Sequence, residues 1–214
     1  MSILRDKFIY VSRPWNTNDI TEGVLQGCSE QSEEVKELGY ICLSKTCNSP
    51  AMWGYYADRS RGACLVFDID FDEYKQESKC RVCNEVKYSL NRISSNSPIE
   101  ELLFTKAADW QHEQEYRLLF KLYDLKHCTR MVNGQETVLF YDSKLFKYLS
   151  GVILGAHCKK QCAEITAILP QCKKAVTKMQ LDSSLFSFQE HRAIPEKDKG
   201  DIDNIYTPPN LMDD

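Results

Sequence analysis

Glycine is scarce in this chain, which has 9 glycines among 214 residues. None of them forms the patterns G-x-G-x-x-G or G-x-x-x-x-G-K-[ST], whose glycines let the backbone wrap around a phosphate. The sequence therefore gives no support for nucleotide binding of the Rossmann or P-loop kind. It also lacks a G-x-S-x-G nucleophile elbow and an H-E-x-x-H helix, so it indicates neither that class of serine hydrolase nor a zinc protease.

Long apolar runs are absent as well. No stretch approaches the about 18 apolar residues that a membrane-spanning helix needs. Arg5, Asp6 and Lys7 stand where a secretory signal would have its apolar centre. We expect no membrane partner and a cytoplasmic protein, whose 10 cysteines are reduced thiols.

The cysteine pattern gives only weak support for a metal site. Cys80 and Cys83 form a C-x-x-C pair, and His157, Cys158 and Cys162 are the candidate partners. A zinc knuckle needs a tight turn that brings both thiolates to one ion. Residues 80–88 instead alternate like a strand, which would send the two thiols to opposite faces. We therefore expect no metal.

The composition is that of an ordinary folded protein, with 43% hydrophobic and 27% charged residues. Strand-like and short helical segments interleave without a regular βαβ rhythm. This pattern predicts one α+β domain over residues 1–195, with a mixed, largely antiparallel sheet and short flanking helices. Residues 196–214 are acidic and contain Pro208-Pro209, which predicts a flexible C-terminal tail.

Four segments carry clear signals of local structure. Residues 29–38 are expected to form a helix that Gly39 ends. Pro50 suits the first position of a short helix over residues 51–57. Residues 80–88 and 113–122 are predicted strands.

The formal charge of −4 hides an asymmetry. Residues 117–178 hold 11 basic and 4 acidic side chains, a net of +7, whereas the remainder holds 16 and 27, a net of −11. Such a split can mark an anion-binding face on an acidic body, which could hold nucleic acid through its phosphates. The alternative is that these lysines are merely solvated on helix surfaces.

A short acidic pattern carries the strongest chemical hint. In a strand, Glu113, Glu115 and Arg117 would share one face. Arg117 would favour the ionised form of Glu115, while repulsion between the carboxylates would raise the pKa of one of them. An ionised glutamate beside a steering arginine suits an oxocarbenium-like transition state at a sugar. The alternative is an ion-pair ladder on an exposed strand.

An aromatic stretch lies earlier, in the segment Met-Trp-Gly-Tyr-Tyr-Ala. Its rings could form a stacking wall for a base or a nicotinamide. The alternative is that Met52, Trp53 and Tyr56 form the core-facing side of a helix.

Taken in order, these segments resemble the bacterial family called domain of unknown function 2971, and the likeness runs from about Phe8 to Leu169. Near the start, Asn18 and Asp19 match the Asn-Asp part of the family's Asn-Asp-Pro motif, although Ile20 replaces the proline. The other matching segments are residues 42–44, 52–57, 61–64, 67–68, 86–88, 110–117 and 151–155.

The motif order of this family is itself similar to that of ADP-ribosyltransferases. The resemblance implies an enzyme that transfers ADP-ribose from NAD to a nucleic acid or a protein, in a bacterial toxin or antiviral defence setting. NAD would then be a substrate, with Glu115 as the catalytic carboxylate, Glu113 as its assistant and Arg117 keeping Glu115 ionised. The residues implied to hold NAD are Ser44, Trp53, Tyr56, Asn18 and Asp19.

Two departures from the family favour an alternative. Tyr55 stands where members carry a histidine. Members also begin with a further strand, which normally helps to grip NAD, ahead of the equivalent of Phe8. The alternative is a non-enzymatic relative that binds a nucleotide, a nucleic acid or a protein partner. A third interpretation is a hydrolase of sugars or nucleotides that uses the same carboxylates.

Overall fold

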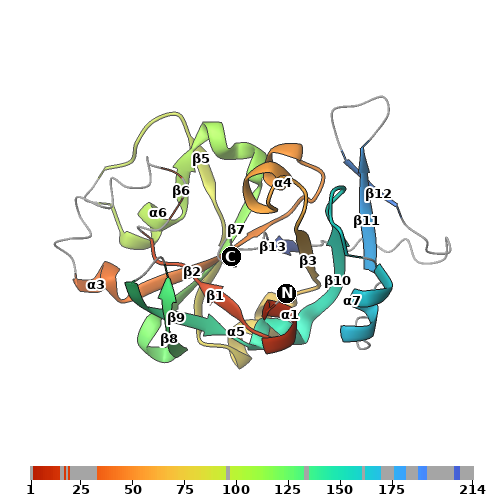
Figure 1. Cartoon of the computed structure of the whole chain (residues 1–214). Coiled ribbons are helices and arrows are strands. Elements are labelled where there is room, and N and C mark those ends of the chain that lie inside the picture. Colours follow the sequence, from red (N-terminus) through yellow and green to blue (C-terminus); the bar gives the residue numbers. More distant parts are fainter. Residues whose placement is uncertain are drawn as a thin grey trace. The chain divides into compact units, whose positions relative to one another are not determined.

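The computed structural model describes residues 2–14, 17, 19, 33–94, 97–132, 135–160, 162–169, 176–181, 188–191 and 205–207 (Figure 1). Its helices are short and its strands pair mostly antiparallel, which confirms the predicted α+β class. The chain divides into two compact units, which we describe separately. Among the described residues, no helix has the length and apolar character needed to cross a membrane.

Unit 1 comprises Met1–Lys7, Leu43–Ile69 and Leu145–Asp214. Its strands follow the order β12-β11-β10-β3-β13, in which β10 and β11 run parallel and the other neighbours antiparallel. The strands are β3 (Ala63–Phe67), β10 (Leu149–Leu154), β11 (Val176–Leu181), β12 (Phe188–His191) and β13 (Ile205–Thr207). The helical segments are α1 (Ser2–Asp6), α4 (Pro50–Tyr56), η3 (Lys144–Tyr148), which begins one residue before this unit, and α7 (Cys162–Ile168).

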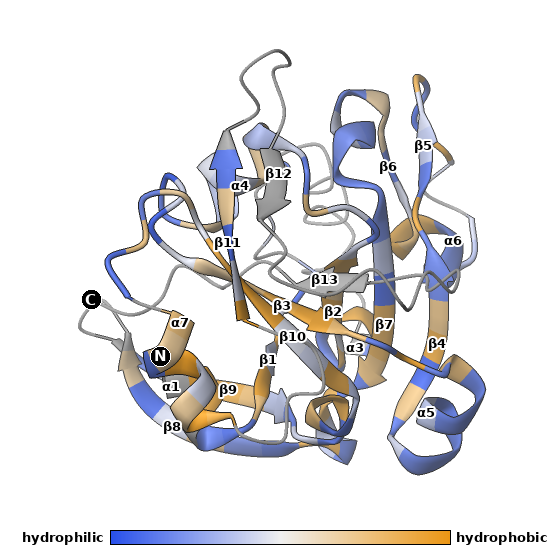
Figure 2. Cartoon of the chain, turned by 90° about the vertical axis from the view of Figure 1, so that its right-hand side faces the viewer, coloured by the Kyte–Doolittle hydropathy of each residue, from blue (hydrophilic) through white to orange (hydrophobic). Residues whose placement is uncertain are grey.

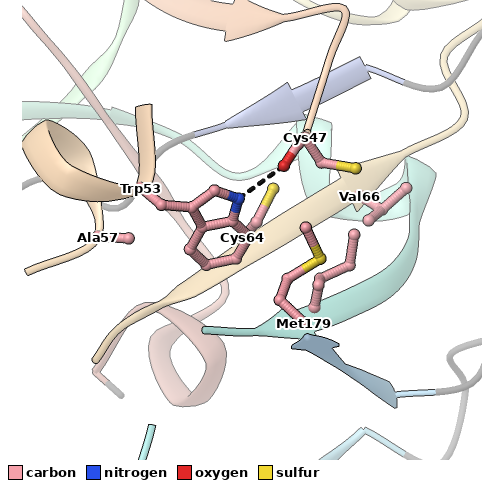
Figure 3. Packing of buried hydrophobic residues seen from close by; sticks show 7 residues of the cluster. Cys47, Trp53, Ala57, Cys64, Val66 and Met179 are labelled. Carbon is pink, nitrogen blue, oxygen red and sulfur yellow. Dashed lines mark hydrogen bonds between the residues drawn. The ribbon is translucent and has the colours of Figure 1, made fainter. Parts of the chain in front are cut away.

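The core of unit 1 forms where α4 packs on the sheet. Pro50 opens α4 as predicted, and the helix buries Met52 and Trp53. Trp53 packs with residues of β3, β10 and β11, and its Nε1 donates a 2.6 Å hydrogen bond to the carbonyl oxygen of Cys47 (Figure 3). In Figure 2, β3 is coloured as strongly apolar, in keeping with a strand buried in a sheet.

Unit 2 comprises Phe8–Cys42 and Asp70–Lys144. It contains the strand sets β2-β7-β4, β1-β9-β8 and β5-β6. The strands are β1 (Ile9–Val11), β2 (Leu38–Ser44), β4 (Cys80–Glu85), β5 (Lys87–Ser89), β6 (Thr105–Ala107), β7 (Glu115–Lys121), β8 (Lys126–Val132) and β9 (Gln135–Asp142); the last two residues of β2 belong to unit 1. The helical segments are α3 (Glu33–Lys36), α5 (Phe71–Glu77), α6 (Ile99–Leu103), η1 (Ala108–Glu113) and η2 (Leu122–Asp124).

The core of unit 2 lies between its central strands and α6. Tyr40 of β2 and Leu119 of β7 pack against Leu103 at the end of α6. All three side chains are nearly inaccessible to solvent. Each buried side chain of this size contributes roughly 1.5–3 kcal/mol to folding, and together they fix β2, β7 and α6 around the acidic pattern.

The structure corrects two of the predicted boundaries. The helix predicted to end at Gly39 ends earlier, since α3 covers Glu33–Lys36 and Gly39 lies inside β2. A glycine fits this position in the strand because a Cβ would come within 2.7 Å of Leu122 and 2.8 Å of Val11. The predicted strand over residues 80–88 is broken at Val86 into β4 and β5. Within residues 196–214, the predicted tail, Ile205–Thr207 forms β13, and the rest of that segment lies outside the described residues.

Candidate functional site

Glu115 and Arg117 face the same side of β7 and form a two-point ion pair. Arg117 donates from Nε to Oε1 of Glu115 at 2.7 Å and from Nη2 to Oε2 at 3.0 Å. Alternate residues of a strand point to one face, so the i, i+2 spacing predicts this contact. Arg117 also donates from Nη1 to the carbonyl oxygen of Leu103. The guanidinium is therefore held by groups on two elements.

Glu113 reaches the same cluster by a different route from the predicted strand. It is the last residue of η1, and Gln114 follows in the left-handed conformation with φ 43° and ψ 52°. That turn carries the chain into β7. Lys106 of β6 then lies between the two carboxylates, with Nζ 2.5 Å from Oε2 of Glu113 and 3.3 Å from Oε2 of Glu115.

This buried charge cluster, Lys106, Glu113, Glu115 and Arg117, is formally neutral. Its side chains are 5%, 4%, 4% and 2% exposed. The alternative of an exposed ion-pair ladder is therefore wrong. Two cationic groups and two carboxylates satisfy one another where water cannot, as buried ions require.

The electrostatics hold Glu115 in its charged form. Burial by itself would raise the pKa of Glu115, but the charges of Arg117 and Lys106 outweigh it and lower that pKa to about 2. The thiol of Cys42 on β2 donates a hydrogen bond to the same carboxylate, and burial followed by the charge of Glu115 raises the pKa of this thiol. Glu115 is thus an anion at neutral pH.

Aromatic side chains surround the charge cluster. The ring of Tyr40 lies 4.6 Å from the Arg117 guanidinium, and the ring of Trp110 lies 4.7 Å from Lys106 Nζ. The backbone N–H of Glu115 donates to the hydroxyl of Tyr88 at 2.8 Å. Trp110 and Tyr88 are half-buried, so they form the more accessible edge of the cluster.

The residues that the resemblance assigned to NAD binding are distributed over both units. Asp19 belongs to unit 2 and is buried, and Asn18 lies outside the described residues. Ser44, Trp53 and Tyr56 belong to unit 1. The Ser44 hydroxyl bonds to the backbone oxygen and nitrogen of Thr46 in a local turn.

The two aromatics of α4 differ in their surroundings. Trp53 is 3% exposed and sits in the core of unit 1, as the core-facing alternative predicts. Tyr56 is half-buried, with its ring centroid 6.3 Å from that of Tyr55. Because Trp53 is packed in the core, only Tyr56 of these two aromatics is accessible enough to stack with a base or a nicotinamide.

A second cluster in unit 2 combines aromatic rings with basic groups on the β1–β9–β8 sheet. The register pairs Tyr10 with Tyr141 and Tyr141 with Lys126, so these three residues share one face. Phe8 and Arg130 fall on the same face by alternation along their strands. We call these five residues the aromatic–basic face.

The contacts across the aromatic–basic face are direct. The ring of Phe8 lies 4.6 Å from that of Tyr141 and 5.0 Å from that of Tyr10. The Arg130 guanidinium lies 6.0 Å from the Phe8 ring and 5.9 Å from the Tyr10 ring. The three aromatics are half-buried, whereas Lys126 and Arg130 are exposed.

Sequence reasoning missed Lys106 and the aromatic–basic face. In the sequence, Lys106 is followed closely by Trp110, Glu113 and Glu115, and this spacing is the one signal that could have pointed to it. The spacing does not show, however, that Lys106 lies between the two carboxylates. Lys126 and Arg130 fall in the basic segment 117–178, whereas Phe8 and Tyr10 lie more than a hundred residues earlier.

Within the described part of the chain, no three His, Cys, Asp or Glu side chains are grouped to hold a metal ion. No known family model, curated protein or solved structure matches this chain.

Proposed function

We propose that the protein binds single-stranded nucleic acid through the aromatic–basic face of unit 2. The observation that carries this proposal is the placement of Arg130 against Phe8 and Tyr10, next to Tyr141, on adjacent strands. Rings that are partly open on a sheet can stack with bases, and nearby cations neutralise phosphates; the three rings of this face are half-buried. Lys126 and Arg130 also belong to the segment of net charge +7.

The buried charge cluster supports a structural role better than a catalytic one. A carboxylate that stabilises an oxocarbenium ion must contact the sugar directly. Both oxygens of Glu115 already accept hydrogen bonds from Arg117, and one also contacts Lys106. We infer that the cluster fixes β6, η1 and β7 relative to one another.

The test measures binding of a fluorescent single-stranded oligonucleotide by anisotropy. Phe8→Leu keeps an apolar side chain but removes a stacking ring, and should weaken binding at least about fivefold, since one base stack contributes about 1–3 kcal/mol. Arg130→Ala should weaken binding by a similar factor.

Arg92→Ala is the matched control, because Arg92 is also an exposed arginine of unit 2 but follows β5, which pairs with β6 and not with β1, β8 or β9. It should bind like the unchanged protein. Equal affinities for Phe8→Leu, Arg130→Ala and Arg92→Ala would refute this surface as the binding site.

A second candidate function is ADP-ribosyl transfer from NAD, which the family resemblance implies. The observation that favours it is that the half-buried Tyr88 contacts Glu115 and the half-buried Trp110 contacts Lys106 of the same cluster. In this interpretation the aromatic edge admits the nicotinamide end of NAD, and Glu113 and Glu115 lie beneath it.

Radiolabelled NAD tests this second candidate. The protein is incubated with NAD and a bacterial lysate, and label in nucleic acid and protein is counted. Glu115→Gln should abolish transfer, whereas Glu136→Gln, at an exposed glutamate of β9, should not change it. Absence of transfer by the unchanged protein, or full transfer by a folded Glu115→Gln variant, contradicts the enzyme.

A further inference from the structure

Cys80 and Cys83 lie on the same face of β4, contrary to the prediction from a regular strand. Their Sγ atoms are 3.2 Å apart. The cause is a β-bulge: Cys80 pairs with Phe120 but Val82 pairs with Leu119, so Arg81 is an extra residue. Cys83 then pairs with Leu118. Because residues 118 and 120 share a face of β7, so do the two cysteines.

The two thiols differ in access. Cys80 is buried at 7% exposure, while Cys83 is half-buried. Cys80 also lies 3.3 Å from the carbonyl oxygen of Val82. A reagent from solvent therefore reaches the sulfur of Cys83 more easily than the buried sulfur of Cys80.

The electrostatics favour the same order. The hydrogen bond from Cys80 lowers the pKa of Cys83, and the charge of Lys75 acts in the same direction against the effect of burial. The bond to Cys83 and burial raise the pKa of Cys80 well above its ordinary value. A thiolate is the attacking species in thiol–disulfide exchange, so Cys83 is the group prepared to react.

We propose that Cys80 and Cys83 form a redox-active dithiol that exchanges with small-molecule disulfides. The bulge brings the two sulfur atoms into contact, so closing the bond to about 2.05 Å needs a movement of only about 1 Å. This site is independent of the proposed nucleic-acid surface.

The reaction balances as an ordinary exchange. The Cys83 thiolate attacks one sulfur of the oxidant's disulfide, whose S–S bond breaks and releases a thiolate that takes up a proton. Cys80 then loses its proton and attacks Cys83, which forms the Cys80–Cys83 bond and expels the second thiol. The two cysteines lose two electrons and the oxidant gains them.

Peptide mapping of the full chain tests the proposal. The reduced protein is equilibrated with oxidised glutathione, free thiols are alkylated, and the chain is cut after glutamates. Cleavage after Glu77 and Glu85 leaves both cysteines in one peptide, residues 78–85. We expect this peptide to appear unalkylated and lighter by two hydrogen atoms. A peptide that carries two alkyl groups, or glutathione alone, overturns the proposal.

Alkylation kinetics test the assigned order of the two thiols. Cys83 should react with iodoacetamide at lower pH than Cys128, a half-buried cysteine of β8 that serves as the control. Cys80→Ala removes the hydrogen bond that lowers the pKa of Cys83, so it should raise the pH midpoint of Cys83 alkylation and leave that of Cys128 unchanged. Identical profiles for Cys83 and Cys128 would exclude Cys83 as the attacking thiol.

Discussion

At the scale of single residues, the position of Lys106 decides what the two glutamates are. Without it, Glu113 and Glu115 would be neighbouring carboxylates of which only one is paired by Arg117. With Nζ 2.5 Å from Glu113 and 3.3 Å from Glu115, the same carboxylates become half of a neutral buried network. Burial makes every member necessary, because each lost partner leaves an uncompensated charge away from water.

Replacing Lys106 by methionine should lower the free energy of unfolding by about 3–5 kcal/mol, because it leaves buried carboxylate charge uncompensated. Urea unfolding followed by tryptophan fluorescence measures the change. The control is Lys87→Met, at an exposed lysine of β5, which should stay within about 0.5 kcal/mol. Equal stability of both variants would contradict the role of Lys106.

The pKa of Glu115 predicts a loss of stability in acid. Its pKa of about 2 in the folded protein lies below the ordinary glutamate value of 4.5. The stabilisation is therefore complete above about pH 4.5 and disappears as the pH falls towards 2, a change of about 3 kcal/mol. Unfolding measured from pH 6 to pH 2 should show this slope.

Glu115→Gln separates this residue from the other acids of the chain. The variant is less stable at neutral pH, but its stability should change less between pH 4.5 and pH 2, since the titrating group is gone. Glu136→Gln, at an exposed position, should retain the original slope. An unchanged slope in Glu115→Gln would show that another group carries the acid response.

At the scale of elements, two irregularities of the backbone bring reactive or charged side chains into contact. The left-handed Gln114 joins η1 to β7, so Glu113 contacts Lys106 from the end of η1 rather than from the strand. The bulge at Arg81 brings Cys80 and Cys83 to one face. Both are local departures from regular alternation, and a pattern of period two in the sequence cannot reveal them.

The glycines of β2 and α4 should respond to alanine in opposite ways. At Gly39 the added Cβ would lie 2.7–3.0 Å from Leu122, Val11 and Ser12, so Gly39→Ala should destabilise the protein by about 1–3 kcal/mol. At Gly54 nothing lies within 4 Å, so Gly54→Ala should stabilise it by about 0.5–1 kcal/mol. Thermal unfolding of both variants checks the pair; a stabilising Gly39→Ala would contradict the packing around β2.

At the scale of the whole molecule, net charge is a poor guide to partners. The total of −4 contains a segment of +7, and part of that segment forms β8 and β9 beside β1. In unit 2 the pairing of β1 with β9 and of β9 with β8 places Lys126 and Arg130 near Phe8 and Tyr10, which lie more than a hundred residues earlier in the sequence. A local surface of this kind governs binding to a polyanion more than the sum of charges does.

The aromatic–basic face should give oligonucleotide binding a clear salt dependence. If Arg130, Lys126 and one further cation each neutralise a phosphate, the affinity should fall about 20-fold between 50 and 200 mM salt. Anisotropy titrations at several salt concentrations measure the slope, and Arg130→Ala should make it shallower by about one neutralised phosphate. A flat response would argue against phosphate contacts at this surface.

Periodicity and spacing, which act over a few residues, were enough to predict the α+β class, helix α4 with its opening proline, and the pairing of Glu115 with Arg117. Three features follow from the folded chain alone: the burial of the acidic pattern and its neutralisation by Lys106, the contact of Phe8 and Tyr10 with Arg130, and the contact between Cys80 and Cys83. Those outcomes depend on strand pairing between distant segments and on single extra residues, and such non-local contacts have no periodic signature in a chain read along its length.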